Sequence, residues 1–253
     1  MRLSIIAVSL LSALSALPAF ADETPTNTFT GNITFASDYR FRGISQTFKL
    51  PAVQGGLDYS HKSGLYVGTW MSNVSSNSYA NGNSMEWDGY GGYKFPVGQV
   101  TLDFGGLYYY YPGAHFSVPA HTKYDNFELY GAATWKWLTF KYSYGVTDFF
   151  GTNHDTYGGD DSKGSMYYDL TANIPVAEKV TLNAHVGHQM VANYGDLSYT
   201  DWKLGATYDL NGWGLSAAYI DTNAKKDWYY ACNDEKCKKT GEGTVVLSVS
   251  KTF

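Results

Sequence analysis

The strongest constraint on the fold is a recurring alternation of apolar and polar residues with a period of two. In the last stretch, 244–253, one face carries small polar residues and the other is mainly apolar. The mainly apolar face holds Phe253, Lys251, Val249, Leu247 and Val245. The same pattern recurs at 29–35, 85–95, 100–110, 166–174, 180–190 and 202–210. Successive side chains of a β-strand point to opposite sides, so this pattern predicts strands with one apolar and one polar face.

The connections between these stretches have two lengths, which alternate strictly along the chain. Five are short, at 61–64, 95–98, 136–137, 175–178 and 211–212. Six are long, at 38–51, 73–84, 112–124, 150–164, 192–199 and 222–242. Short turns at one end and long loops at the other are typical of bacterial outer-membrane proteins. We therefore predict an all-β fold, an antiparallel up-and-down transmembrane β-barrel of 12 strands.

Charged residues on the polar faces favour a water-filled lumen over a dry core. The pore-lining candidates on these faces are Glu86, Asp88, Lys94, Asp103, Glu128, Asp169, Lys203 and Asp209. Aromatic residues near strand ends, as in the girdles of membrane barrels, are Phe95, Trp135, Trp137, Trp202, Trp213, Tyr219 and Phe253. The alternative is a soluble, Tyr-rich β-sandwich. The stretch 65–74 is ambiguous, because Tyr66 and Trp70 oppose its aliphatic residues.

Residues 1–21 have the pattern of a cleaved signal peptide. Arg2 precedes an apolar run, and Ala19-Phe20-Ala21 has the small residues of a cleavage site after Ala21. We expect residues 22–253 to form the outer-membrane barrel. Without Arg2, 17 basic residues stand against 23 acidic ones, so the chain has no basic surface for nucleic acid.

Three segments near the start of the predicted barrel carry a family resemblance. They are S-D-Y-R-F-R-G-I-S-Q-T at 37–47, P-A-V-Q-G-G-L-D-Y at 51–59 and G-L-Y-V-G-T-W at 64–70. Together with the Tyr-rich stretch at 107–111 and the last strand, they resemble the TorF family of porins. The resemblance implies an outer-membrane β-barrel that acts as a porin, and it brings neither a settled substrate nor a catalytic motif.

The C-terminal strand resembles the segment by which outer-membrane barrels are recognised for insertion, because it ends in an aromatic residue, Phe253, after alternating apolar residues. We therefore expect the barrel-assembly machinery and membrane lipids as partners. Lys251 departs from the apolar pattern, and a lysine so close to a strand end can extend its ammonium group to water.

Asp38, Arg40 and Arg42 form the most concentrated charged group. Continuing the alternation from 29–35 places these three side chains in the lumen and turns Tyr39 and Phe41 toward lipid or the interface. Two arginines at a pore mouth would set a local field for anions or sugar carboxylates. The alternative is that they pair with lumen acids, such as Asp58, Glu86 or Asp88, and only brace the wall.

The same alternation gives a charge count for the whole lumen. The acids are Asp58, Glu86, Asp88, Asp103, Glu128, Asp169, Asp201 and Asp209. The bases are Lys94, Lys136, Lys141, Lys203, Arg40 and Arg42. The excess of acids predicts a mild cation preference, unless the arginines line the narrowest point and dominate.

Other motifs point to structural roles. Cys232 and Cys237 lie in the last long loop and predict a disulfide. Oxygens of Asn153, Asp155, Asp160 and Asp161 could bind Ca²⁺, but the spacing of an EF-hand is absent, and a solvated acidic loop is the preferred interpretation. His185 faces inward and His188 outward, and neither belongs to a recognisable catalytic motif.

We therefore expect a porin for passive diffusion of small polar solutes or ions, with no catalytic residues, metal or cofactor. The alternative is a barrel of the same kind with a plugged lumen and an enzymatic or adhesive role.

Overall fold

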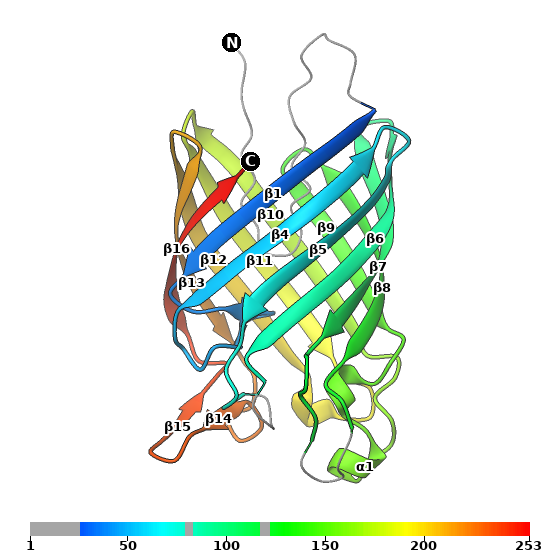
Figure 1. Cartoon of the computed structure of the whole chain (residues 1–253), viewed down its shortest axis with the longest axis vertical. Coiled ribbons are helices and arrows are strands. Elements are labelled where there is room, and N and C mark those ends of the chain that lie inside the picture. The colour runs from blue at the N-terminus through cyan, green and yellow to red at the C-terminus, as the bar shows by residue number, and fades with distance from the viewer. Residues whose placement is uncertain (1–25, 79–82, 117–121) are drawn as a thin grey trace.

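The computed structural model describes residues 26–78, 83–116 and 122–253 (Figure 1). The predicted signal peptide, residues 1–21, lies outside the described residues.

The described residues form a closed barrel of 12 antiparallel strands, as the sequence predicted. The strands are β1 (Asn27–Ala36), β4 (Ala52–His61), β5 (Leu65–Asn73), β6 (Met85–Val97), β7 (Val100–Tyr110), β8 (Asn126–Trp135), β9 (Leu138–Gly145), β10 (Met166–Ala177), β11 (Val180–Met190), β12 (Tyr199–Leu210), β13 (Trp213–Thr222) and β16 (Thr244–Thr252). Each strand pairs with its sequence neighbours, and β1 closes the ring on β16 with Ile33 opposite Lys251.

The long loops gather at one end of the barrel, opposite the C-terminus (Figure 1). The first, L1 (37–51), contains the hairpin β2 (Arg40–Phe41) and β3 (Ile44–Ser45). The fourth, L4 (146–165), contains η1 (Phe149–Gly151) and α1 (His154–Tyr157), and the fifth contains η2 (Gly195–Leu197). The last, L6 (223–243), contains the hairpin β14 (Tyr230–Cys232) and β15 (Cys237–Lys239). Among the described residues no helix is long and apolar enough to cross a membrane.

Two of the predicted short turns are shifted along the chain. The strands β6 and β10 continue through the proline-containing segments 95–97 and 175–177, and the turns are at 98–99 and 178–179. Pro96 stays in register opposite Thr101, whereas the register shifts next to Pro175, and prolines in strands are tolerated at such irregular or end positions. The reversal after β6 instead uses Gly98, whose φ is +61°, because tight hairpins need left-handed backbone.

The barrel wall has its apolar side chains outside and its polar ones inside. Large apolar residues at alternating positions are exposed on the outer surface, among them Leu57, Val67, Phe104, Leu129, Leu204 and Leu247. The inward positions hold buried polar residues, among them Gln54, Glu86, Asp88, Gln189 and Asp201. In the ambiguous β5, Tyr66 and Trp70 are buried inside and Leu65 and Val67 are exposed. This arrangement is the inverse of a soluble core, and it excludes the β-sandwich.

The outward face predicts a specific response to charge. Leu204 lies in the middle of β12 and is 66% exposed. For a barrel in a bilayer, Leu204→Arg should lower the free energy of unfolding by about 2–4 kcal/mol. Leu204→Ala is the control and should cost less than about 1.5 kcal/mol. The measurement is urea unfolding of the protein in phospholipid vesicles, and equal losses for the two variants would contradict a lipid-facing position.

Candidate functional site: the lumen and its inward-folded loop

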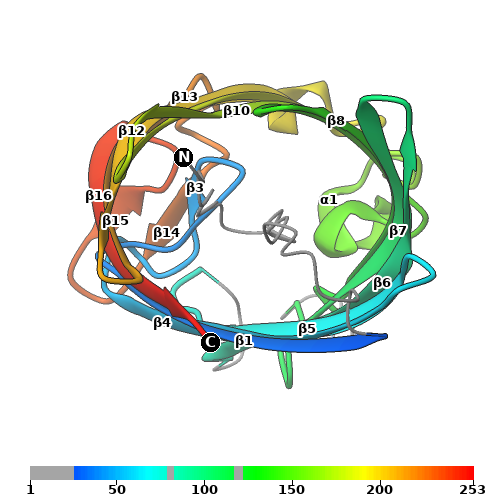
Figure 2. The ribbon, with the colours of Figure 1, turned by 90° about the horizontal axis from the view of Figure 1, so that it is seen from above.

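The loop L1 leaves the barrel wall after β1 and folds into the lumen, where Figure 2 shows β3 inside the ring of strands. Its residues Tyr39, Ser45, Thr47 and Phe48 are all at most 2% exposed. The hairpin β2–β3 turns at Arg42 and Gly43, whose φ angles are +46° and +79°, as in the tightest two-residue turns. The tip of this hairpin therefore projects across the interior of the barrel.

The prediction that Tyr39 and Phe41 face lipid or the interface is wrong. The ring centroid of Tyr39 lies 5.3 Å from that of Trp70, and the ring centroid of Phe41 lies 5.4 Å from that of Tyr109. Both rings are inside the barrel. The alternation of β1 ends at Ala36, where the strand ends, so it cannot be continued into L1. Apolar packing of both rings against the inner wall instead anchors the loop.

Asp38 organises the inner part of L1. Its Oδ2 accepts a hydrogen bond of 2.8 Å from Arg40 Nε, and its Oδ1 accepts bonds from the hydroxyls of Ser45 at 2.6 Å and Thr47 at 3.0 Å. Arg40 Nη1 also donates to the backbone oxygens of Gly43 and Glu242. The segment 37–47 thus encodes a self-braced hairpin in which Arg40 binds its own loop and L6 through Nε and Nη1, while its buried Nη2 has no hydrogen-bond partner among the described residues.

Arg42 connects the hairpin tip to the far wall. Its Nη2 lies 2.6 Å from Glu128 Oε2 on β8, and its Nη1 donates to Gln189 Oε1 on β11 at 2.6 Å. The guanidinium group also lies 4.2 Å from the ring centroid of Tyr167 on β10. Burial acts to lower the pKa of Arg42, but the Glu128 carboxylate, together with Tyr109 and Tyr167, keeps that pKa above its ordinary value. Arg42 is therefore a charged strut across the lumen.

The structure thus places both arginines inside the barrel and in ion pairs. The partners are Asp38 and Glu128, not Asp58, Glu86 or Asp88. The arginines thus pair with acids inside the barrel, as the bracing alternative expected, although with other acids than those named. Their effect on selectivity stays a prediction.

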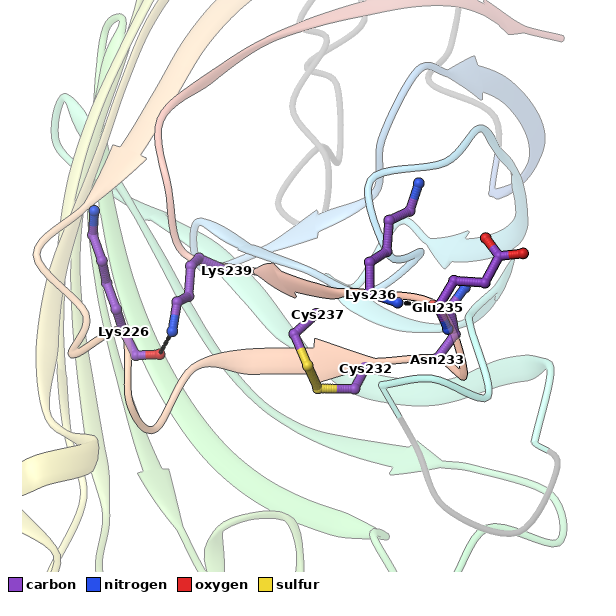
Figure 3. Close-up of a disulfide and its surroundings, with 7 residues drawn as sticks. All are labelled: Lys226, Cys232, Asn233, Glu235, Lys236, Cys237 and Lys239. Atoms are coloured by element: carbon purple, nitrogen blue, oxygen red, sulfur yellow. Dashed lines mark hydrogen bonds between the residues drawn. A yellow bond between two sulfur atoms is a disulfide. The ribbon is translucent and has the colours of Figure 1, made fainter.

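Loop L6 covers L1 from the outer side. The backbone N–H of Ser45 donates to Thr240 O at 3.0 Å, and Lys238 Nζ donates to Phe48 O at 2.8 Å. Cys232 and Cys237 form a disulfide that joins β14 to β15, the hairpin that carries Lys238 (Figure 3). Hydrogen bonding to Lys226 lowers the pKa of the Glu242 carboxyl. These contacts of L6 therefore hold L1 in place from the outer side of the barrel.

A cavity of about 130 Å³ lies between L1 and the inner wall. L1 contributes Asp38, Arg40, Phe41, Arg42 and Gly43, and the charged wall residues are Lys141, Asp169, His185, Asp201 and Lys203. Lys141, Asp169, His185 and Lys203 come from four consecutive strands, β9 to β12. The cavity thus has a charged wall opposite the guanidinium groups of L1.

Within this wall His185 links the two acids. Its Nε2 lies 2.9 Å from Asp201 Oδ1, and its Nδ1 lies 3.5 Å from Asp169 Oδ1. Thr171 donates to Asp169 at 2.7 Å, and the Tyr167 hydroxyl donates to Asp201 at 2.9 Å. Both carboxylates are therefore already hydrogen-bonded within the wall.

The remaining pore-lining candidates lie away from this cavity. Lys94 and Asp103 form an ion pair of 3.5 Å nearer the short turns, and Asp209 accepts a hydrogen bond from Gly212 N at the last short turn. The expectation that Lys136 faces the lumen is wrong: it lies exposed in a turn, against the Trp135 ring. The φ of Lys136 is +55°, which is not strand geometry, so the alternation of the strand is interrupted at this position.

Glu86 and Asp88 face inward from β6 but are completely buried behind L1. The hydroxyl of Tyr39 donates to Glu86 Oε1 at 3.1 Å. Neither carboxylate oxygen of Asp88 has a hydrogen-bond partner among the described residues. Glu86 thus contacts L1 through Tyr39, and neither acid lines the cavity.

Sequence reasoning assigned inward positions to Lys141 and Asp201 without singling them out, and Tyr167 was missed. The available signal for Lys141 was its position opposite Asp169 in the hairpin of β9 and β10, just as His185 lies opposite Lys203 in that of β11 and β12. In L4, Asn153 caps α1 through its side-chain oxygen. No group of three His, Cys, Asp or Glu residues in the described part of the chain could hold a metal.

The barrel has the architecture of outer-membrane porins. The KdgM porin structure superposes with a TM-score of 0.51 at 7% identity, over 88% of this chain and 99% of KdgM. The NanC porin structure gives a TM-score of 0.50 at 11% identity, over 89% of this chain and 98% of NanC. At such identities the likeness concerns the fold alone.

The sequence also matches a family model over residues 21–253, described as bacterial protein of unknown function (Gcw_chp). The chain therefore belongs to the Gcw_chp family. No match was found among curated proteins.

The strut between L1 and β8 can be tested by a double-mutant cycle. Arg42→Gln and Glu128→Gln each leave one buried charge without its partner, so each should destabilise the barrel, and the pair should show a coupling of about 1–3 kcal/mol in urea unfolding. The exposed pair Lys225 and Asp196 is the control, with an expected coupling below about 1 kcal/mol. Equal coupling in the two cycles would contradict a structural strut.

Proposed function

We propose that this chain is a bacterial outer-membrane porin that passes small polar solutes or ions by passive diffusion. The observation that carries this proposal is the closed barrel with an apolar outer surface and a charged cavity inside. The resemblance of segments 37–47, 51–59 and 64–70 to the TorF porins supports the same function. On this proposal the protein needs no cofactor and catalyses no reaction.

L1 is the constriction of the proposed pore. It crosses the interior from β1 to β8 and β11 through Arg42, and it forms one side of the cavity. Pore radius and charge at the narrowest point set the selectivity of a channel. The solutes that pass are therefore those that fit between L1 and strands β9 to β12.

The last strand supports the proposed partnership with the barrel-assembly machinery. Phe253 forms two backbone hydrogen bonds with Gly31 on β1, of 2.7 and 2.9 Å, at the place where the barrel closes. Its ring is 72% exposed on the outer surface, where it would meet lipid and the assembly machinery.

Single-channel recording tests the porin directly. The wild-type protein in a planar bilayer should give stepwise ionic currents. Replacing residues 37–51 by Asn-Gly should raise the conductance several-fold, because Ala36 and Ala52 are already paired and a two-residue hairpin can join them. Silent wild-type barrels with a conducting L1 deletion would support the plugged alternative, and two silent proteins would contradict a pore.

Labelling of intact cells tests the proposed orientation. Long loops lie outside the cell in outer-membrane barrels and short turns in the periplasm. An epitope inserted near Lys225 in L6 should be labelled on intact cells, whereas one at Asn211 should need a broken outer membrane. The opposite result would invert the orientation.

A further inference from the structure

We propose that Lys141 and Lys203 bind a small carboxylate anion in the cavity beneath L1 and make the pore prefer anions. The inference rests on the proposed function and names the solute class of its constriction. It differs from the expectation drawn from the total lumen charge, which is a mild cation preference.

The two arginines near the cavity are already committed to other groups. Arg40 binds Asp38 and two backbone oxygens, and Arg42 binds Glu128 and Gln189. The one Arg40 nitrogen without a partner among the described residues, Nη2, is buried and not exposed to a passing solute. Exchanging these contacts for a passing anion would leave buried carboxylates without a partner, which is costly. The arginines therefore shape the site rather than bind the solute.

The two lysines are in a different situation. Lys141 on β9 and Lys203 on β12 both line the cavity. Within the described part of the chain neither ammonium group has a carboxylate within the 4.0 Å of an ion pair. Lys141 Nζ instead lies 4.1 Å from the ring centroid of Tyr130. An ammonium group without a direct counter-ion at the edge of a cavity can accept an anion.

The acids of the cavity do not cancel this charge. Asp169 and Asp201 share His185 and accept further hydrogen bonds from Thr171 and Tyr167, and Asp38 is held by Arg40. Of the four basic residues that line the cavity, Arg40 and Arg42 are paired with Asp38 and Glu128, whereas Lys141 and Lys203 have no such direct partner. The two lysines are thus the basic groups at the cavity that remain without a direct ion pair, although the whole lumen has an excess of acids.

The size of the cavity limits the anion. Its volume of about 130 Å³ is that of roughly four water molecules in the liquid. An anion of a few heavy atoms, such as acetate, fits this space. Its methyl end would face Phe41, Leu107 and Val246, which also line the cavity.

Acetate is the probe for this site. ¹³C-acetate binding to the detergent-solubilised barrel, measured by NMR line broadening, should be weakened about tenfold in Lys141→Gln/Lys203→Gln, because each lost charge is worth roughly threefold. Lys136→Gln, which removes a lysine from the exposed turn beside β9, should bind as the wild type does. Lys141→Arg/Lys203→Arg keeps the charges and should retain binding. Heat-modifiable migration shows that each variant is folded.

The reversal potential in a potassium acetate gradient provides the second readout. The wild-type channel should favour acetate, and the double glutamine variant should shift about tenfold toward potassium in permeability ratio. Unchanged acetate binding in the folded double variant, or a wild-type preference for potassium, would overturn the inference. Acetate binding that needs both lysines in a barrel without current would support the anion site and contradict the porin.

Discussion

A β-barrel in lipid must satisfy every backbone hydrogen bond within its own wall, and the rest of this structure depends on that closure. Here it is achieved where β1 meets β16, from Ile33 opposite Lys251 to the terminal pairing of Phe253 with Gly31. Once the ring is closed, each inward residue faces a confined space. Charged groups there find partners across the lumen, as Arg42 does with Glu128.

The interior depends on L1 more than on the wall. Asp38 fixes the hairpin, Arg42 ties its tip to the far side, and L6 closes over it with its disulfide-linked hairpin. These contacts divide the lumen charges into two groups. Glu86, bonded to Tyr39, and Asp88 are completely buried, whereas Lys141 and Lys203 line the cavity. In the proposed pore, selectivity would follow from the position of a loop as well as from the composition of the wall.

Much of the wall could be predicted from the sequence, because a period of two determines on which face each residue of a strand lies. Glu128, Asp169 and Lys203 face inward as the alternation requires. The prediction failed where the strand ended, at Tyr39 and Phe41, and where a turn began, at Lys136. The alternation could not predict the ion pairs either, because Arg42 and Glu128 are 86 residues apart and only the fold brings them together.

The central claim is that L1 spans the lumen, and cross-linking tests it most directly. Arg42→Cys combined with Glu128→Cys should be joined by a short bismaleimide in the folded barrel, since the native side chains are in contact. Cys232 and Cys237 are held in a disulfide and cannot react with the maleimide groups. Arg42→Cys combined with Leu129→Cys is the control, because Leu129 is the next residue on β8 and points outward. Cross-linking to position 128 and not to 129 is the predicted result, and no cross-link to 128, or equal cross-linking to both, would contradict the account.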